Sequence, residues 1–118
     1  MDEDRFWEIV QRVHDISAGD MDRKCVALRQ QIAALSKEGA LEFGHLFDAM
    51  MNKAYRWPLW DAAYVIHGRC SNDTFTDFRS SLISRGRQAY ERASADPESF
   101  AEENFDEQDG STKVTNTL

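Results

Sequence analysis

Apolar side chains recur every three or four residues along most of this chain, which is the spacing of one face of an α-helix. Two such stripes fill the first third of the sequence. The first consists of Phe6, Ile9, Val10, Val13 and Ile16, and the second of Met21, Cys25, Leu28, Ile32 and Leu35. No β-type alternation of five or more residues appears outside the stripes, and no internal repeat is visible. The chain is therefore predicted to be all-α, with Cys25 on the core face of the second helix.

Residues that favour helix termini predict where the first three helices begin and end. Asp2 or Asp4 is suited to accept hydrogen bonds from the free N–H groups of the first helix, and Asp20 is suited to do so for the second. Gly19 is expected at the left-handed stop between them. Ser36 is the expected N-cap of a third helix, whose apolar stripe consists of Ala40, Phe43, Phe47, Met50 and Ala54.

The second half of the chain begins with a bend at Pro58. Proline disfavours helix for the residue before it but suits the first turn of a new helix, so a fourth helix is expected from Pro58 to about His67. Gly68 supplies the C-terminal stop of that helix, and Ser71 caps a fifth. Gly86 marks either a break or a close contact, and a further helical stretch follows it. The sequence thus predicts five to six helices.

Length and charge predict one domain followed by a tail. A chain of 118 residues is long enough for one hydrophobic core and too short for two. Of the net charge of −7, all but one unit belongs to residues 94–118, so residues 1–93 are nearly neutral. From residue 102 onward the sequence is acidic and then rich in Ser, Thr and Asn, with too few apolar residues to offset the entropy of ordering. We expect a compact helical bundle over residues 1–101 and a disordered acidic tail over residues 102–118.

Several protein classes are disfavoured by the composition. The two cysteines are a poor disulfide framework, and the chain opens with Met-Asp-Glu-Asp rather than with a signal peptide. No apolar run approaches the roughly 18 to 20 residues that span a bilayer. A cytoplasmic protein with no membrane partner is therefore expected. A nearly neutral body with an acidic tail also argues against a nucleic-acid partner.

One segment is specific enough to be compared with known families. Residues 54–73 read Ala-Tyr-Arg-Trp-Pro-Leu-Trp-Asp-Ala-Ala-Tyr-Val-Ile-His-Gly-Arg-Cys-Ser-Asn-Asp. Together with the Phe6-Trp7 opening, this segment resembles the bacterial domain-of-unknown-function family 4240, over about residues 1–101. The resemblance implies a compact helical fold and a bacterial origin, and it supplies no catalytic residues. Members of that family often have Trp where this chain has Ser81, and they commonly continue into another helix where this chain has its acidic tail.

The same segment opens the richest cluster of candidate functional side chains. The candidates for binding a ligand or partner are Trp57, Trp60, Asp61, Tyr64, Asp73 and Arg79. Trp60 and Tyr64 lie one turn apart on one helix face, where they could form an aromatic pocket with polar anchors. The favoured interpretation is structural: two indoles cover the bend at Pro58, and Arg79 forms an ion pair while lying over aromatic surface.

Motifs for metal binding, cofactor binding and catalysis are not recognisable. His67 and Cys70 are three residues apart, but a glycine stop falls between them and no Cys-x-x-Cys or His-Glu-x-x-His is present, so neither metal nor cofactor is expected. Cys70 at a helix N-terminus could be an activated nucleophile, although a small buried thiol before an N-cap is the favoured interpretation. Asp61 and Asp73 form the one carboxylate pair suited to acid–base chemistry.

The favoured function is a non-catalytic helical binding or adaptor domain that contacts another protein through the corner at residues 57–61. Two alternatives remain open. One is an enzyme or small-molecule-binding protein that uses Trp60, Asp61, Tyr64, Asp73 and Arg79. The other is an immunity-type inhibitor whose acidic tail or face blocks a basic toxin. The oligomeric state is left undetermined.

Overall fold

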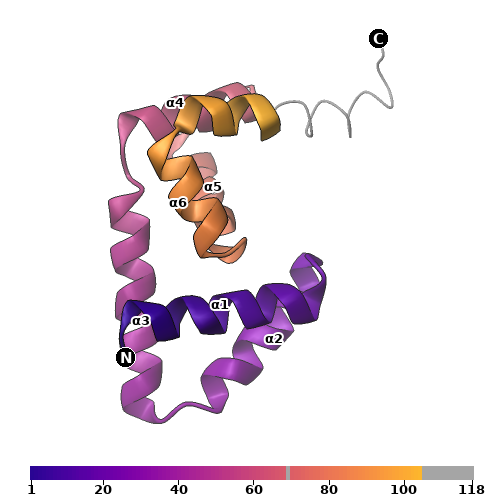
Figure 1. Cartoon of the computed structure of the whole chain (residues 1–118), viewed down its shortest axis with the longest axis vertical. Helices are drawn as coiled ribbons and strands as arrows, with labels where there is room; N and C mark the ends of the chain where they lie inside the picture. Colours follow the sequence, from indigo (N-terminus) through magenta and orange to yellow (C-terminus); the bar gives the residue numbers. More distant parts are fainter. Residues whose placement is uncertain (69, 105–118) are drawn as a thin grey trace.

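The computed structural model describes residues 1–68 and 70–104, and every regular element within these ranges is a helix. The named helices are α1 (Glu3–Ser17), α2 (Met21–Ala33), α3 (Lys37–Lys53), α4 (Trp57–His67), α5 (Asn72–Ser84) and α6 (Arg87–Ala95). Residues 97–104 form a further helical segment. The all-α prediction is therefore confirmed for the part of the chain that the structure describes (Figure 1).

With the last helical segment, the described structure has more helices than the five to six predicted. Asp96 leaves helical geometry with φ −143° and ψ 76°. Pro97 then begins the last segment, at a position where its missing N–H would have no partner in any case. Phe100 and Ala101 are buried, so this segment belongs to the core. Residues 102–104 continue it instead of beginning the predicted tail; the disorder predicted for residues 105–118 lies outside the described residues.

Side-chain caps begin four of the helices, as the sequence predicts. The side chains of Asp2, Asp20, Ser36 and Ser71 accept backbone N–H hydrogen bonds in the first turns of α1, α2, α3 and α5. Helix α4 has no such cap, but Pro58 lies in its first turn and Gly68, with φ +81°, ends it. The C-cap of α1 is Ala18, with φ 51°, and the predicted Gly19 follows it, also in the left-handed region with φ +82°. Local signals therefore fix most helix boundaries to within a residue.

Helix α3 runs along the long axis of the molecule, with helices packed at both of its ends (Figure 1). Helices α1 and α2 pair with each other beside its N-terminal half, and α4 lies with residues 97–104 at the opposite end. The ring of Phe6 in α1 lies 4.8 Å from that of Phe43 in α3, and the ring of Trp7 lies 5.2 Å from that of Tyr90 in α6. Helix α1 therefore contacts both α3 and α6 through aromatic side chains.

The buried face of α2 matches the predicted one only in part. Lys24 and Ala27 are its fully buried residues, whereas Met21 and Cys25 are exposed, so the prediction that Cys25 lies in the core is wrong. The other three stripe residues, Leu28, Ile32 and Leu35, are partly buried and pack against the core. The predicted stripe therefore faces the core along its C-terminal part and solvent at its N-terminal end.

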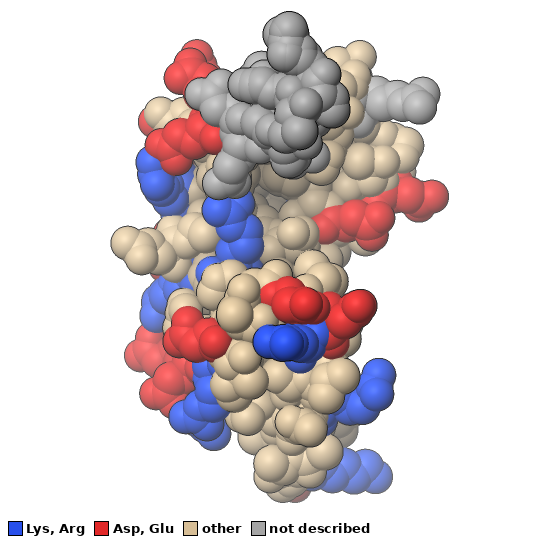
Figure 2. Space-filling view, turned by 90° about the vertical axis from the view of Figure 1, so that its right-hand side faces the viewer, with Lys and Arg blue, Asp and Glu red and all other residues tan. Residues whose placement is uncertain are grey.

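Charged side chains of both signs are interspersed on the molecular face shown in Figure 2. On the described part of that face, neither Lys and Arg nor Asp and Glu form a broad area of one sign. This distribution agrees with the nearly neutral charge of residues 1–93. Among the described helices, none is long and apolar enough to cross a bilayer.

Candidate functional site

The corner between α3 and α4 is built from four aromatic side chains. The ring of Trp60 lies 4.6 Å from that of Phe75, 5.6 Å from that of Trp57 and 5.8 Å from that of Tyr55. Tyr55 also contacts Phe75 edge to face, at 5.5 Å. Aromatic pairs at these separations contribute stability in addition to that from the burial of their apolar surface. The structure therefore joins α4 to α5 through Trp60, which stands at the centre of this aromatic cluster.

Arg79 closes the cluster from α5. Its guanidinium carbon lies 4.7 Å from the centre of the Tyr55 ring and 4.8 Å from that of Phe75, and the residue is only 6% exposed. One guanidinium nitrogen donates to the carbonyl of Met51 at 2.8 Å, and another to the hydroxyl of Thr76 at 3.3 Å. The position over aromatic surface confirms the prediction, but the partners are a neutral carbonyl and hydroxyl rather than the expected carboxylate. Arg79 thus ties α5 to the last turn of α3.

The two indoles of the corner have different environments. Trp60 is partly buried, and its indole N–H donates to the carbonyl of Cys70 at 3.2 Å, which links α4 to the segment before α5. Trp57 contacts Trp60 on one side but is 75% exposed. The predicted covering of the bend therefore falls mainly to Trp60, and Trp57 presents most of its surface to solvent.

The remaining candidates do not converge with Trp60 and Arg79. Asp61 and Tyr64 are exposed on α4, and Asp73 is exposed in the first turn of α5. Asp61 lines a depression of about 460 Å³ between α4 and residues 95–101, where Asp96 and Glu98 contribute two further carboxylates. Asp73 is not among the residues that line this depression. The proposed acid–base pair of Asp61 and Asp73 therefore has no shared cavity in the described structure.

The thiol of Cys70 is the candidate nucleophile considered from the sequence. Burial raises the pKa of the Cys70 thiol, and its Sγ donates weakly to the carbonyl of Ser71 at 3.7 Å. Activation as a nucleophile requires the opposite shift, because the thiolate is the reactive form. Within residues 1–68 and 70–104, no group of three or more His, Cys, Asp or Glu side chains is arranged to hold a metal ion.

Comparison with protein families identifies the chain. A family model described as "Protein of unknown function (DUF4240)" matches residues 1–116. This chain is a member of that family. The resemblance inferred from residues 54–73 is thereby confirmed, and the match continues beyond residue 101 to nearly the whole chain. No curated protein and no solved structure shows significant similarity to the chain.

A second concavity in this DUF4240 protein is lined by none of the predicted candidates. It is a groove of about 410 Å³ to which α1, α2, α3 and α5 all contribute. One wall is apolar and includes Val13, Met21, Leu28, Phe43 and Phe47. The other wall, on α5, carries Asp77, Ser80, Ser81 and Ser84, and Lys24 completes the lining. None of the residues predicted to bind a ligand lies in this groove, although the polar positions of α5, repeated at intervals of three and four, are a sequence signal for its polar wall.

Proposed function

We propose that this protein is a non-catalytic binding module that recognises another protein through the exposed face of α4. This α4 face consists of Trp57, Asp61, Tyr64 and Val65. The observation that carries the proposal is the exposure of Trp57, a residue type that usually contributes strongly when it is buried in an interface. Tyr64 and Val65 are also at least half exposed, so the apolar surface is larger than one side chain.

A rigid support favours recognition by this face. Trp57 lies against Trp60, which in turn packs on Phe75 and is hydrogen-bonded to Cys70. The α4 face is therefore held in place before a partner arrives, which reduces the entropy lost on binding. A polar rim around an aromatic centre is the usual anatomy of such an interface.

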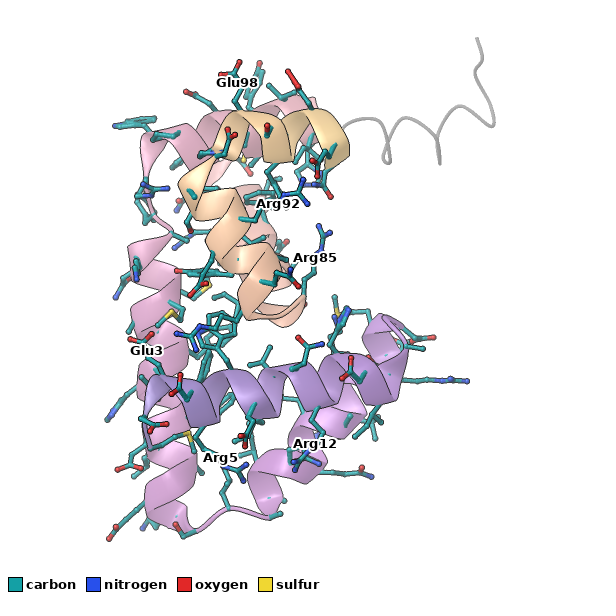
Figure 3. The ribbon with its side chains drawn as sticks, viewed as in Figure 1. Glu3, Arg5, Arg12, Arg85, Arg92 and Glu98 are labelled. Atoms are coloured by element: carbon teal, nitrogen blue, oxygen red, sulfur yellow. The ribbon has the colours of Figure 1, made fainter. Side chains whose placement is uncertain are left out.

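Carboxylates beside the α4 face indicate the chemistry of the partner. Asp61, Asp96 and Glu98 line the adjacent depression, and its described lining contains no Lys or Arg. Figure 3 shows Glu98 pointing outward from the last helical segment, away from the ribbon. A partner that presents Lys or Arg next to an apolar anchor would match this surface in charge and in hydrophobicity. An immunity-type inhibitor of a basic toxin would be one protein of this kind.

The enzyme alternative receives less support. The indole N–H of Trp60 already donates to the carbonyl of Cys70, and two guanidinium nitrogens of Arg79 donate to Met51 and Thr76, whereas Arg79 Nε is buried without a partner among the described residues. A substrate would have to compete with these bonds, and the cost of leaving buried polar groups unpaired is substantial.

Affinity capture with paired variants tests the proposal. The full chain, Trp57→Ala and Leu41→Ala are used as baits, because Leu41 is a comparably exposed apolar residue on α3. We expect one protein to be retained by the parent and by Leu41→Ala, and to be lost with Trp57→Ala. Asp61→Asn should weaken the same capture and reduce its sensitivity to salt. The proposal would be refuted if all baits retained the same proteins equally, or if no retained protein were lost with Trp57→Ala.

A further inference from the structure

We infer that the groove among α1, α2, α3 and α5 binds a small amphipathic acid, whose carboxylate pairs with Lys24 and whose apolar body lies against α1, α2 and α3. This site is separate from the α4 face and does not depend on the proposed function. Its three supporting features are the buried cation of Lys24, the two unlike walls of the groove, and its dimensions.

The side-chain nitrogen of Lys24 is buried, and its described hydrogen-bond partners include no carboxylate. Lys24 is 6% exposed, and its Nζ lies 3.0 Å from His14 Nδ1, 3.1 Å from the Ser84 carbonyl oxygen and 3.2 Å from the Ser84 hydroxyl oxygen. Among the described residues, no Asp or Glu forms an ion pair with it. Buried charges in proteins are usually paired with an opposite charge. Lys24 is therefore a buried amine with no carboxylate partner among the described residues.

The electrostatic surroundings of Lys24 also favour an added negative charge. Burial, together with the positive charge of Arg85, lowers the pKa of the Lys24 amine. An anion beside the ammonium would act in the opposite direction and stabilise the charged form. A carboxylate beside the ammonium would form a charge-assisted hydrogen bond, which is about twice as strong as a neutral one.

The two walls of the groove define the rest of the ligand. The wall from α1, α2 and α3 is aliphatic and aromatic, so it suits an apolar body. The wall from α5 carries the hydroxyls of Ser80 and Ser81, and Asp77 lies farther along it. Asp77 repels a carboxylate, so the acid is oriented with its head group toward Lys24.

The dimensions fit a small molecule. The groove of about 410 Å³ lies in the range of about 300 to 1,000 Å³ that is typical of ligand pockets. Positions 77 and 84 on α5 are separated by about 10 Å along the helix axis, at about 1.5 Å per residue. This length accommodates a medium-length aliphatic chain or a bicyclic aromatic body beside the head group.

Calorimetric titration of the full chain with decanoate, below its critical micelle concentration, tests the inference. Indole-3-acetate serves as an aromatic acid, and decanol serves as the uncharged match of decanoate. We expect at least one acid to bind with a stoichiometry of one, and decanol to bind at least tenfold more weakly than decanoate. Lys24→Met retains an apolar stem and removes the charge, so it should weaken acid binding at least tenfold and leave decanol unaffected. Lys53→Met, at an exposed position at the end of α3, should behave as the parent does.

A second variant locates the bound molecule without altering the cation. Cys25 is exposed and lines the groove, so Cys25→Trp places a large ring there without disturbing the core. This variant should lose binding of both acids while keeping the melting temperature of the parent. The inference would be overturned if neither acid bound the parent, if decanol and decanoate bound equally well, or if Cys25→Trp retained full affinity.

Discussion

The hydroxyl of Tyr90 donates a 2.7 Å hydrogen bond to the carbonyl of Met50, and this bond joins α6 to the C-terminal part of α3. Tyr90 is buried, and its ring contacts that of Trp7 in α1. Because one side chain thus touches two other helices, α6 is positioned by packing and by a polar bond together. Burial raises the pKa of the Tyr90 phenol, with Arg56 opposing and Glu3 adding to the shift.

Tyr90→Phe should reduce stability and change its dependence on alkaline pH. At neutral pH the loss of the hydrogen bond should cost about 1 kcal/mol, because Met50 keeps its backbone bond from Ala54. Folded Tyr90 holds its proton more tightly than the unfolded chain does, so its contribution is present below about pH 10 and is lost as the pH rises through the folded pKa. Urea unfolding from pH 7 to pH 11 should show a steeper alkaline loss for the parent. Parallel curves for the two proteins would contradict this assignment.

Lys24→Met should change the pH dependence of stability in the opposite sense. The pKa of folded Lys24 is lowered, so the unfolded chain binds more protons between the folded value and about 10.4. Parent stability, measured relative to the variant, should therefore rise as the pH increases through that window. A difference that stays constant from pH 6 to pH 10 would show that the amine is not desolvated.

Gly86 and Gly44 should respond to alanine in opposite directions. Gly86 has φ +109°, and a Cβ added there would lie 2.6 Å from the side-chain oxygen of Gln11. Gly86→Ala should therefore cost more than about 1 kcal/mol, mainly through backbone strain. Gly44 lies within α3 with open space around its missing Cβ, so Gly44→Ala should stabilise the fold by about 0.5 to 1 kcal/mol.

Chemical denaturation of the two glycine variants measures both effects. Adding Gln11→Ala to Gly86→Ala removes the contact but leaves the strained backbone, so most of the loss should remain. If the double variant recovered the full stability of the parent, the contact with Gln11 and not the backbone conformation would be the cause of the loss in Gly86→Ala.

Trp57→Ala and Trp60→Ala should separate an exposed indole from a packed one. Trp57 is 75% exposed, so its truncation should change the free energy of unfolding by no more than about 0.5 kcal/mol. Trp60 is partly buried against Phe75 and Tyr55, so its truncation should cost about 2 to 3 kcal/mol, below the value for a fully buried ring. Thermal and urea unfolding measure both. A large loss with Trp57→Ala would mean that the α4 face is structural.

Helix boundaries could be predicted because their causes are local. A capping side chain such as Ser71 bonds to an N–H three residues away, and Gly68 adopts its left-handed conformation within its own turn. The family segment was recognisable for a similar reason, since it consists of consecutive residues. The last helical segment was missed because the residues from 102 onward are acidic and predicted a tail, whereas residues 97–104 are helical and Phe100 and Ala101 are buried in the core.

The candidate site could be predicted only in part. Arg79 was placed correctly over aromatic surface, because a long basic side chain among aromatic residues has few better positions. Its bond to the carbonyl of Met51 had no sequence signal, since every residue offers a carbonyl. Trp57 is far more exposed than Trp60 although the two residues are only three positions apart. The difference arises because only Trp60 packs against α5.

The sequence by itself determined that this protein is helical, where most of its helices begin and end, and which family it belongs to. Those properties depend on periodicity, on caps and on short motifs, all of which act over a few residues. The tertiary structure decided that Lys24 is buried and Cys25 exposed, and that α5 supplies one wall of a groove. These outcomes depend on which helix packs against each face of α2 and of α5. Such choices are made by contacts between residues far apart in the chain, and an apolar stripe does not specify its partner.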